Sequence, residues 1–328
     1  MYTIKDVASK AGLSQATVSR VLNNHPYVSE EKKRAVHKAM DELGYVPNSS
    51  AQRLRNLKTK KIAVLVSRIV NPFFSQLVDA MEKRAAGAGF QVILCNTRID
   101  KEKELEYFQL LKSKQVDGII MASVENSWDV IEPYTKYGPI IYCNEYDPAA
   151  QVIRVRLDQI EGGYIGTKHL LDKGHRKIAY CQGNDSSVST NRRKGYLKAV
   201  TEASLIPQPD WMFKNIFTIE DGREIFRKLM ALPETPTAVF TGSDEVAAGI
   251  IKEAQQQAWR VPEDLAVIGF DDQPIAELLD PQITTINQFT TDIGVTAMNI
   301  MLEIIHDPAV NKPQDILLPI HLIERQST

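Results

Sequence analysis

Short apolar runs alternate with amphipathic helical segments from Lys61 onward, and this alternation restricts the fold more than any other feature of the sequence. A strand followed by a helix, repeated along a chain, predicts doubly wound parallel sheets of the α/β class. The rhythm breaks around Tyr146–Asp158, where Gln151–Leu157 adds a further strand, so we expect two lobes. The other strand-like runs are Ile62–Val66, Val92–Cys95, Gly118–Ala122, Ile140–Cys143, Ile178–Cys181, Ala238–Thr241 and Ala266–Gly269.

The N-terminal segment follows a helical pattern instead. Thr3 can cap a helix that Gly12 ends, and Ser14 can cap a second short helix over Gln15–Asn23. A third helix closes at Gly44. Two short helices joined by a glycine-containing turn form the helix-turn-helix motif, which places its second helix in the major groove of DNA.

The second predicted helix carries side chains that suit base recognition. Gln15 offers an amide that can bind adenine in a bidentate manner, and Ala16 presents a small apolar surface of the kind that meets a thymine methyl group. Arg20 can reach a guanine. Polar side chains that extend the same face are Thr17, Ser19 and Asn23. A three-helix bundle with an incidental polar face is the alternative that this pattern leaves open.

The charge distribution favours a nucleic acid as the partner of the N-terminal segment. Residues 1–61 carry twelve Lys and Arg against five Asp and Glu, although the whole chain of 328 residues has a net charge of −2. The rest of the chain is therefore acidic. A basic head on an acidic body suits a phosphate-binding module joined to a part that does not itself bind DNA.

The N-terminal residues also form a more specific pattern. The runs concerned are Thr3–Ala8, Ala11–Ser14, Ala16–Asn23, Val28–Ser29, Leu43–Asn48 and Ala51–Leu54. Together they resemble the DNA-binding signature of the LacI/GalR family of bacterial repressors, and the resemblance extends over essentially the whole chain. It implies an N-terminal three-helix helix-turn-helix head and a hinge helix, followed by a two-lobed, periplasmic-binding-protein-like parallel α/β body.

The resemblance implies three domains, of which the second is a hinge that contacts DNA. The segment after Pro47 is too short and polar to form a stable helix alone, so we expect it to fold on the operator, with Leu54 wedged into the minor groove. A packing role for Leu54 in a linker is the alternative. Further DNA-binding positions are Thr3, Ile4, Ser14, Tyr27, Asn48, Ala51 and Arg55. The expected domains are 1–47 (DNA binding), 48–60 (hinge) and 61–328 (effector binding and dimerisation), the last divided into an N lobe (61–159 and 290–317) and a C lobe (160–289 and 318–328).

The same resemblance implies a small-molecule site between the lobes. Arg192 matches the family's ligand-binding arginine, whose planar fork suits vicinal hydroxyls or a carboxylate. Phe73 can stack on a sugar face, and Asp271 corresponds to a residue that accepts hydrogen bonds from hydroxyls. Ser243 stands where several sugar-binding members have asparagine, which argues against transferring a named sugar. The other candidates are Asn71, Phe74, Asn144 or its neighbour Glu145, Phe217, Asp244 and Thr290.

Structural roles remain open for several of these residues. Asp271 and Asp244 can be helix N-caps, Phe73 can be a core residue, and Arg192 can belong to an ion pair. The six histidines show no paired metal-ligand spacing, and no nucleophile elbow, Walker loop or dinucleotide fingerprint follows a strand. We therefore predict no enzyme activity, no cofactor and no metal site.

These patterns predict a transcription repressor that binds a pseudo-palindromic operator as a homodimer and is controlled by a sugar or sugar derivative. The alternative is a catabolite-control regulator with a phosphocarrier protein as corepressor. No signal peptide and no apolar run of about 20 residues is visible, so we expect a cytoplasmic protein without a membrane partner. Three widely spaced cysteines in apolar runs, Cys95, Cys143 and Cys181, are expected to be small buried residues.

Overall fold

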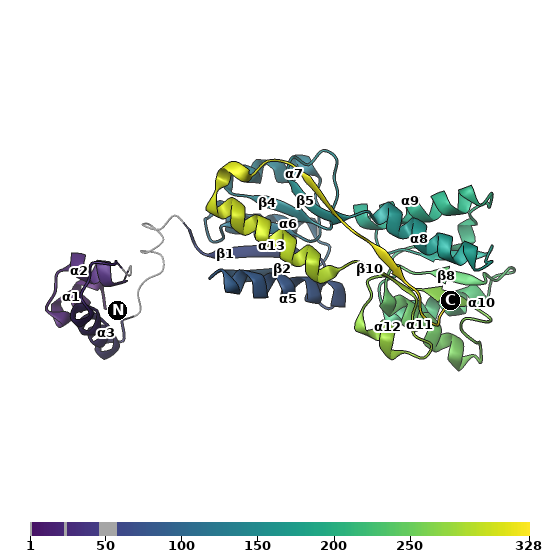
Figure 1. The fold of residues 1–328 in the computed structure, drawn as a ribbon, viewed down its shortest axis with the longest axis horizontal. Coiled ribbons are helices and arrows are strands. Elements are labelled where there is room, and N and C mark those ends of the chain that lie inside the picture. Colours follow the sequence, from purple (N-terminus) through teal and green to yellow (C-terminus); the bar gives the residue numbers. More distant parts are fainter. Residues whose placement is uncertain (1, 23–24, 46–57) are drawn as a thin grey trace. The chain divides into compact units, whose positions relative to one another are not determined.

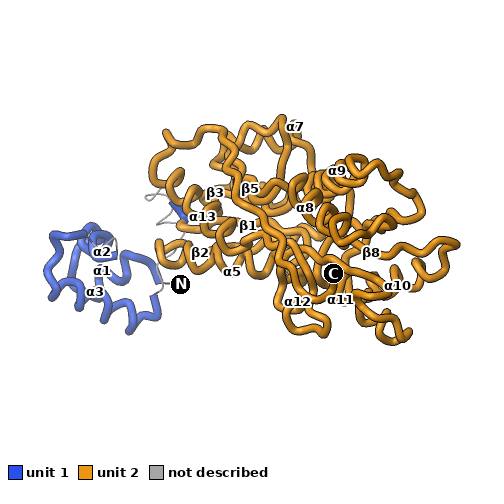
Figure 2. Tube along the Cα trace, turned by 45° about the vertical axis from the view of Figure 1, so that its right-hand side comes forward, with its two compact units in different colours: residues 1–59 blue, residues 60–328 orange. Residues whose placement is uncertain are grey.

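The computed structural model describes residues 2–22, 25–45 and 58–328. The chain forms two compact units, residues 1–59 and residues 60–328, which are coloured separately in Figure 2. We call them the head and the body.

The head is a bundle of three helices, α1 (Ile4–Ala11), α2 (Gln15–Leu22) and α3 (Glu30–Leu43). Gly12 ends the first helix in the left-handed conformation, with φ of 66°, and Gly44 ends the third in the same way. Val7, Val18 and Val36 are fully buried at the centre of the bundle. The predicted helices and their glycine stops are thereby confirmed.

The N lobe of the body is built on a six-stranded parallel sheet with the order β11-β5-β4-β3-β1-β2. Helices α5 and α13 pack against each other (Figure 1). Their apolar side chains join those of the sheet in one core. Strand bounds are β1 (Lys61–Val66), β2 (Gln91–Asn96), β3 (Gly118–Met121), β4 (Ile140–Cys143), β5 (Ile153–Leu157) and β11 (Asp315–Leu318). Helix bounds are α5 (Pro72–Gly87), α6 (Lys101–Lys112), α7 (Trp128–Ile131), α13 (Thr290–His306) and the short 3₁₀ helices η1 (Glu132–Tyr137) and η3 (Pro308–Val310).

The C lobe has a four-stranded parallel sheet with the order β7-β6-β8-β9. Its strands are β6 (Ile178–Cys181), β7 (Met212–Phe213), β8 (Ala238–Phe240) and β9 (Ala266–Ile268). Its helices are α8 (Gln159–Asp172), α9 (Ser187–Glu202), η2 (Pro209–Trp211), α10 (Ile219–Met230), α11 (Asp244–Gln256) and α12 (Pro274–Leu278).

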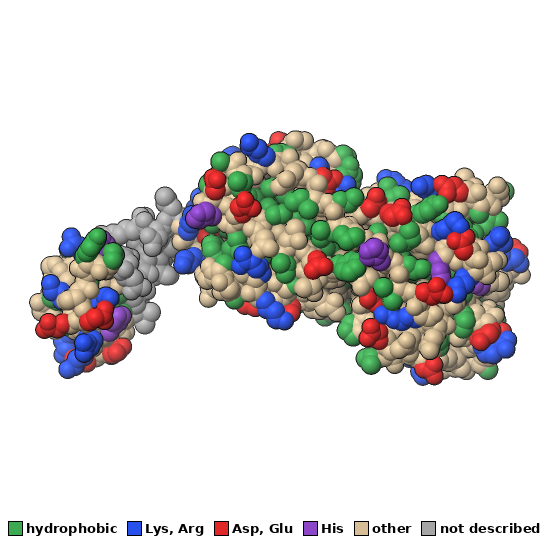
Figure 3. Space-filling model, viewed as in Figure 1, with side chains coloured by type: hydrophobic (Ala, Val, Ile, Leu, Met, Phe, Trp, Pro, Cys, Tyr) green, Lys and Arg blue, Asp and Glu red, His purple; other side chains and the backbone are tan. Residues whose placement is uncertain are grey.

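On the face shown in Figure 3, charged side chains of both signs are interspersed over the body.

The chain passes between the two lobes three times. It leaves the N lobe after β5, returns between β10 (Thr285–Asn287) and α13, and crosses again between β11 and β12 (His321–Ile323), as Figure 1 shows. Strands β10 and β12 pair as an antiparallel ribbon. The end of the chain is anchored in the C lobe because Ser327 Oγ donates a 2.6 Å hydrogen bond to the Val267 carbonyl.

The predicted fold class is confirmed, and so is the burial of the three cysteines, which are free thiols in apolar surroundings. Burial raises the pKa of the Cys95 thiol to about 12. The sequence analysis did not delimit β7, β10, β11 and β12, which have only two to four residues each. Among the helices that the structure describes, none is both long and apolar enough to cross a membrane.

Candidate functional site

One face of α2 is exposed on the surface of the head. Gln15, Ala16 and Arg20 are exposed, and together with Ser19 and Ile4 they line a shallow hollow. Thr17 is half-buried on the same short helix. Most of the side chains predicted to read DNA on this helix therefore face one accessible surface.

Local hydrogen bonds fix where α1 and α2 begin. Ser14 Oγ accepts a 3.1 Å hydrogen bond from the Thr17 backbone N–H, as expected of an N-cap. The Asp6 carboxylate accepts a 2.7 Å hydrogen bond from the backbone N–H of Thr3, which caps α1. Because both helix starts are pinned, the positions of the exposed side chains in the first turn of α2 are set by backbone geometry.

Of the remaining predicted DNA-binding residues, one is exposed in the head and five lie outside the described part of the chain. Tyr27 lies between α2 and α3 and is 91% exposed, with its ring 5.7 Å from that of His25. A tyrosine so exposed contributes little to the head core and is free to contact a partner. Asn23, Asn48, Ala51, Leu54 and Arg55 lie outside the described residues.

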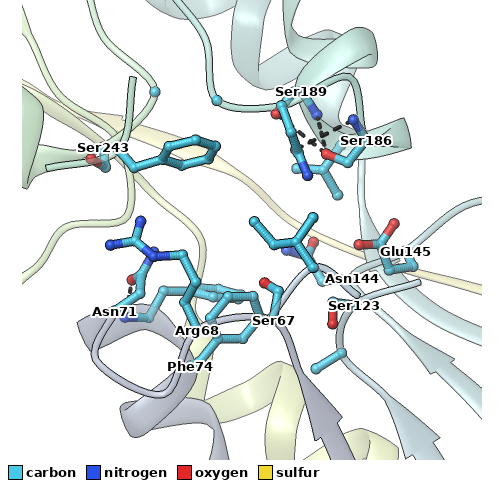
Figure 4. A pocket seen from close by; sticks show the side chains of 18 of the residues that line it. Ser67, Arg68, Asn71, Phe74, Ser123, Asn144, Glu145, Ser186, Ser189 and Ser243 are labelled. Atoms are coloured by element: carbon cyan, nitrogen blue, oxygen red, sulfur yellow. Dashed lines mark hydrogen bonds between the residues drawn. The ribbon is translucent and has the colours of Figure 1, made fainter. Parts of the chain in front are cut away.

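The body contains a cleft between its lobes, with about 850 Å³ of empty space that is partly open to solvent. The loops that follow β1, β3 and β4 line it from the N lobe, and those that follow β6, β8 and β9 line it from the C lobe. Figure 4 shows Ser186, Ser189 and Ser243 across the cavity from Arg68, Phe74 and Ser123. The carboxyl ends of both parallel sheets thus face one cavity, where ligands of such folds bind.

Eight of the ten predicted effector residues line this cleft: Asn71, Phe73, Phe74, Asn144, Arg192, Phe217, Ser243 and Asp271. Asp244 and Thr290 do not. Asp244 is fully buried, and its carboxyl group accepts hydrogen bonds from Thr285 Oγ1 at 2.6 Å and from the Gln273 backbone N–H at 2.7 Å. Burial holds the pKa of Asp244 well above its usual value. Its position indicates a structural role beneath the cleft.

Arg192 projects from α9 and is 8% exposed. Its Nε–H donates to Gln159 Oε1 at 2.7 Å, its Nη1 donates to the Gly242 carbonyl at 3.1 Å, and its guanidinium lies 3.5 Å from the centroid of the Phe270 ring. A Cβ atom at Gly163 of α8 would stand 2.0 Å from the Arg192 carbonyl oxygen, so only glycine allows the two helices to approach this closely. Gly163 therefore serves the packing of α8 against α9.

Asp271 faces Arg192 across the floor of the cleft. Arg192 Nη2 lies 3.9 Å from Asp271 Oδ1, which is close enough for an ion pair and too long for a direct hydrogen bond. Burial raises the pKa of Asp271 to about 6, against the opposing effect of the Arg192 charge. The backbone of Asp271 has φ of 100°, a strained conformation of the kind that clusters at binding sites.

Three buried amides connect the lobes behind this ion pair. Gln159 Nε2 donates to Asn144 Oδ1 at 2.8 Å and to Gln288 Oε1 at 3.0 Å. Gln288 in turn donates through its Nε2 to Asp271 Oδ1. Asn144 follows β4 of the N lobe, Gln159 begins α8 of the C lobe, and Gln288 lies on a crossing segment. A movement of one lobe against the other would therefore strain hydrogen bonds that hold the ligand-facing Asp271.

Aromatic side chains cover parts of the cleft wall. Phe73 is 6% exposed, belongs to the N-lobe core and also lines the cleft, so the core and ligand roles coexist. Its ring meets that of Phe74 edge to face at 5.3 Å. From the opposite lobe, the Phe217 ring lies 5.2 Å from the Arg68 guanidinium. The cavity therefore offers apolar ring faces beside polar groups.

Several lining residues were not predicted from the sequence, among them Arg68, Glu125, Ser186, Ser189 and Gln288. Arg68 is two residues past the end of β1, so a systematic reading of strand ends would have found it. Ser186 is the N-cap of α9 and could have been found as a capping residue. Within the described residues, no group of three or more His, Cys, Asp or Glu is placed to hold a metal ion.

Both units of the chain match known bacterial regulatory proteins in sequence. Residues 3–48 match the model of bacterial regulatory proteins of the lacI family, and residues 167–328 match a periplasmic binding protein-like domain. The NTD biosynthesis operon regulator NtdR of Bacillus subtilis (strain 168) is 45% identical over the full length of both chains. The transcriptional repressor PurR of Mannheimia succiniciproducens is 35% identical, covering 100% of this chain and 98% of its own.

Two solved structures extend this likeness. The Lac repressor dimer bound to operator and the anti-inducer ONPF is 28% identical, with a TM-score of 0.86 over 99% of this chain and 98% of its own. The complex of the transcriptional regulator CelR with cellobiose is 29% identical, with a TM-score of 0.73 over the full length of both chains. The head and the body thus resemble parts that occur together in one kind of protein.

Proposed function

The chain belongs to the LacI family of bacterial regulatory proteins and is a DNA-binding transcription regulator, and from that premise we propose that it is a repressor controlled by a polyhydroxylated small molecule, a sugar or sugar derivative, bound in the body cleft. The resemblance drawn from the sequence motifs is confirmed. The proposal concerns what the family leaves open, which is the ligand and the residues that bind it.

The observation that carries the ligand class is the facing pair of Arg192 and Asp271. Their 3.9 Å separation leaves room for a ligand hydroxyl to accept from the guanidinium and donate to the carboxylate at the same time. Phe73 and Phe217 add apolar surface for the C–H face of a ring. A solved relative holds cellobiose, and a disaccharide of that kind has the matching chemistry.

For DNA recognition we propose that Gln15, Ala16 and Arg20 meet base edges in the major groove. Thr17, Ser19 and Tyr27 would contact the backbone beside them. The Lac repressor binds its operator as a dimer, and we propose the same arrangement here: two copies of the chain on a pseudo-palindromic site. The hinge positions Asn48, Ala51, Leu54 and Arg55 remain part of the proposal through the family resemblance alone.

We do not extend the proposal to a phosphocarrier corepressor, because no feature of the described residues favours it. We also propose no catalytic role, since the relatives are regulators and repressors. Effector control would follow if the ligand binds one arrangement of the lobes better than the other, so that the amide links of Gln159 and Gln288 change with it.

The proposal can be tested in two steps on the full chain. In vitro selection from random duplex DNA should return a site with two inverted half-sites, bound by two copies of the chain in sedimentation analysis. A thermal-shift screen of sugars, sugar phosphates and purines should then find a ligand that raises the melting temperature. A selected site without inverted symmetry would contradict the dimeric reader, and stabilisation by purines but not by sugars would contradict the ligand class.

A further inference from the structure

Two acidic side chains line the cleft beside each other on the N lobe. Glu125 follows β3 and Glu145 follows β4, and these strands are neighbours in the sheet. Glu145 is 7% exposed, while Glu125 is half-buried. Figure 4 shows Glu145 next to Asn144, on the side of the pocket away from Asn71 and Arg68. We call Glu125 and Glu145 the acidic pair.

The hydrogen bonds around Glu145 leave half of its carboxyl group available. Ser187 Oγ accepts a 3.3 Å hydrogen bond from the Tyr146 backbone N–H, and it donates its own proton to Glu145 Oε2 at 2.8 Å. The hydrogen bond from Ser187 favours the ionised carboxylate and so opposes the effect of burial on the pKa of Glu145. Across residues 2–22, 25–45 and 58–328, the hydrogen bond from Ser187 to Oε2 is the one that the Glu145 carboxyl group makes, which leaves Oε1 for a ligand.

The arginine side chains that line the cleft contact groups other than the acidic pair. Arg192 faces Asp271, and that carboxylate also accepts from the amides of Gln288 and Gln273. Arg68 lies over the Phe217 ring of the opposite lobe. Among the described lining residues these are the two arginines, and no lysine joins them, so the acidic pair lacks a cationic neighbour in contact. Asp271 therefore has a cationic partner in Arg192, whereas the acidic pair has no cation in contact.

Burial without a cation is costly for a carboxylate. Burial raises the pKa of Glu145 to about 8, with the nearby charges of Glu125 and Glu104 acting in the same direction and Arg192 opposing them. Burial also raises the pKa of Glu125, against the opposing charge of Lys101. A cation brought between the two groups would reverse both effects, since opposite charge favours the ionised form.

A second cavity adjoins the cleft at this point. It shares Val124 and Glu145 with the cleft and is further lined by Tyr142, Asp147 and Ser187. Tyr142 is fully buried, and its hydroxyl has no hydrogen-bond partner within the described part of the chain. An unpaired buried hydroxyl is costly, and the carboxyl groups of Glu145 and Asp147 line the same cavity. Glu145 therefore borders both cavities.

We propose that the effector is a polyhydroxylated amine, such as an amino sugar, whose ammonium group pairs with Glu145 where the cleft meets the second cavity. Glu125 adds negative charge beside it, and the hydroxyls of the ligand meet Arg192 and Asp271. The ammonium group donates to the free Oε1 of Glu145, which supplies the contact that the protein itself does not make. This inference rests on the proposed function, because it specifies the ligand of the same cleft.

The test is isothermal titration of the full chain with matched sugars that differ in charge. The probes are glucose, glucosamine and N-acetylglucosamine, together with cellobiose and the fully deacetylated dimer of glucosamine. Glucosamine or its dimer should bind at least about tenfold more tightly than its neutral and acetylated partners, because a buried charge-assisted hydrogen bond is worth that factor or more. Glu145→Gln should remove this difference, whereas the exposed Glu132→Gln in the same lobe should keep it.

The outcomes separate this inference from the proposed function. Equal or tighter binding of the neutral sugars, lost on Arg192→Ala, would overturn the amine while leaving a sugar effector in the cleft. Absence of binding by every amine-bearing probe at millimolar concentration would also overturn it. An amine preference that survives Glu145→Gln would place the ammonium elsewhere and contradict the assignment of Glu145. Circular dichroism of each variant establishes that it is folded.

Discussion

The head and the body hold their candidate binding residues in opposite ways. In the head they stand on the surface, as with the exposed Gln15 and Arg20 and with Tyr27 at 91% exposure. In the body they are buried, as with Arg192 at 8% and Asp271 at 7%. An exposed helix can enter the groove of a rigid duplex without rearrangement, whereas a buried cleft can surround a small ligand on most sides.

This difference in exposure affects the salt dependence of binding in the head and the pKa values of side chains in the body. The exposed residues of the head include charged side chains such as Arg20, and contacts between such side chains and DNA phosphates weaken with salt. Burial in the cleft shifts the pKa of Asp271 to about 6 and that of Glu145 to about 8. Binding of a charged ligand in the cleft can therefore change the protonation of these carboxyl groups, whereas the head is expected to bind DNA through exposed side chains.

The largest expected effect comes from separating the two units. Removal of residues 1–58 should lower affinity for the selected operator by at least about a thousandfold, because the body lacks the basic reading surface. Fluorescence anisotropy at several salt concentrations measures this loss, and the steep salt dependence should vanish with it. The isolated body should still bind the cleft ligand in a thermal-shift assay. Specific operator binding by the truncated chain would break the comparison.

Arg192→Ala should weaken binding of the cleft ligand about a hundredfold, since it removes a buried charge-assisted donor. Titration calorimetry measures the change. Arg193→Ala is the matched control, because Arg193 adjoins Arg192 on α9 and does not line the cleft. The head is a separate unit, so operator binding by Arg192→Ala should persist in the absence of ligand. Unchanged ligand affinity would remove Arg192 from the site.

A change in the exposed reading surface should cost less. Gln15→Ala should lower operator affinity roughly tenfold to a hundredfold and relax the preference at one base pair in each half-site, because a single bidentate contact is lost. Competition with operators mutated at each position measures both effects. Lys38→Ala on α3 is the control, since that exposed lysine lies outside the reading helix. An equal loss across every operator position would assign Gln15 to the backbone.

The smallest effect is a pH dependence of stability in the body. The folded pKa of Glu145, about 8, lies above the unfolded value of 4.5, so the folded chain keeps a proton that the unfolded chain releases. This contribution is fully present below pH 4.5 and is lost as the pH rises through 8. Glu145→Gln cannot ionise, so its melting temperature should gain a few degrees on that of the unaltered chain between pH 6 and pH 9. Melting temperatures that depend on pH in the same way for the two proteins would contradict a buried carboxyl group without a cationic partner at Glu145.

The sequence predicted the head well because its determinants are local. Thr3, Ser14, Gly12 and Gly44 sit at helix ends that the structure confirms, and the spacing of apolar residues fixes which side of each helix is buried. The recognition surface then follows from the first turn of α2. The strand ends at Val66, Cys143 and Cys181 were predicted for the same reason, since each closes a run of buried apolar residues.

The cleft was predicted less completely because its details depend on contacts between distant segments. Asp244 adjoins the lining residue Ser243, yet its carboxyl group turns to Thr285, 41 residues further along the chain. Glu125 follows β3 only after a short turn whose geometry the sequence does not specify. Which carboxylates receive a cation depends on where Arg68 and Arg192 end up, and that is a property of the assembled lobes.

The measurement closest to the central claim joins both units in one experiment. Anisotropy of the selected operator is recorded with the full chain, with and without a saturating concentration of the ligand found for the cleft. The account predicts that the ligand changes operator affinity by about fivefold to a hundredfold, and that Arg192→Ala abolishes the change. An operator affinity that is the same with the cleft empty and filled would contradict it.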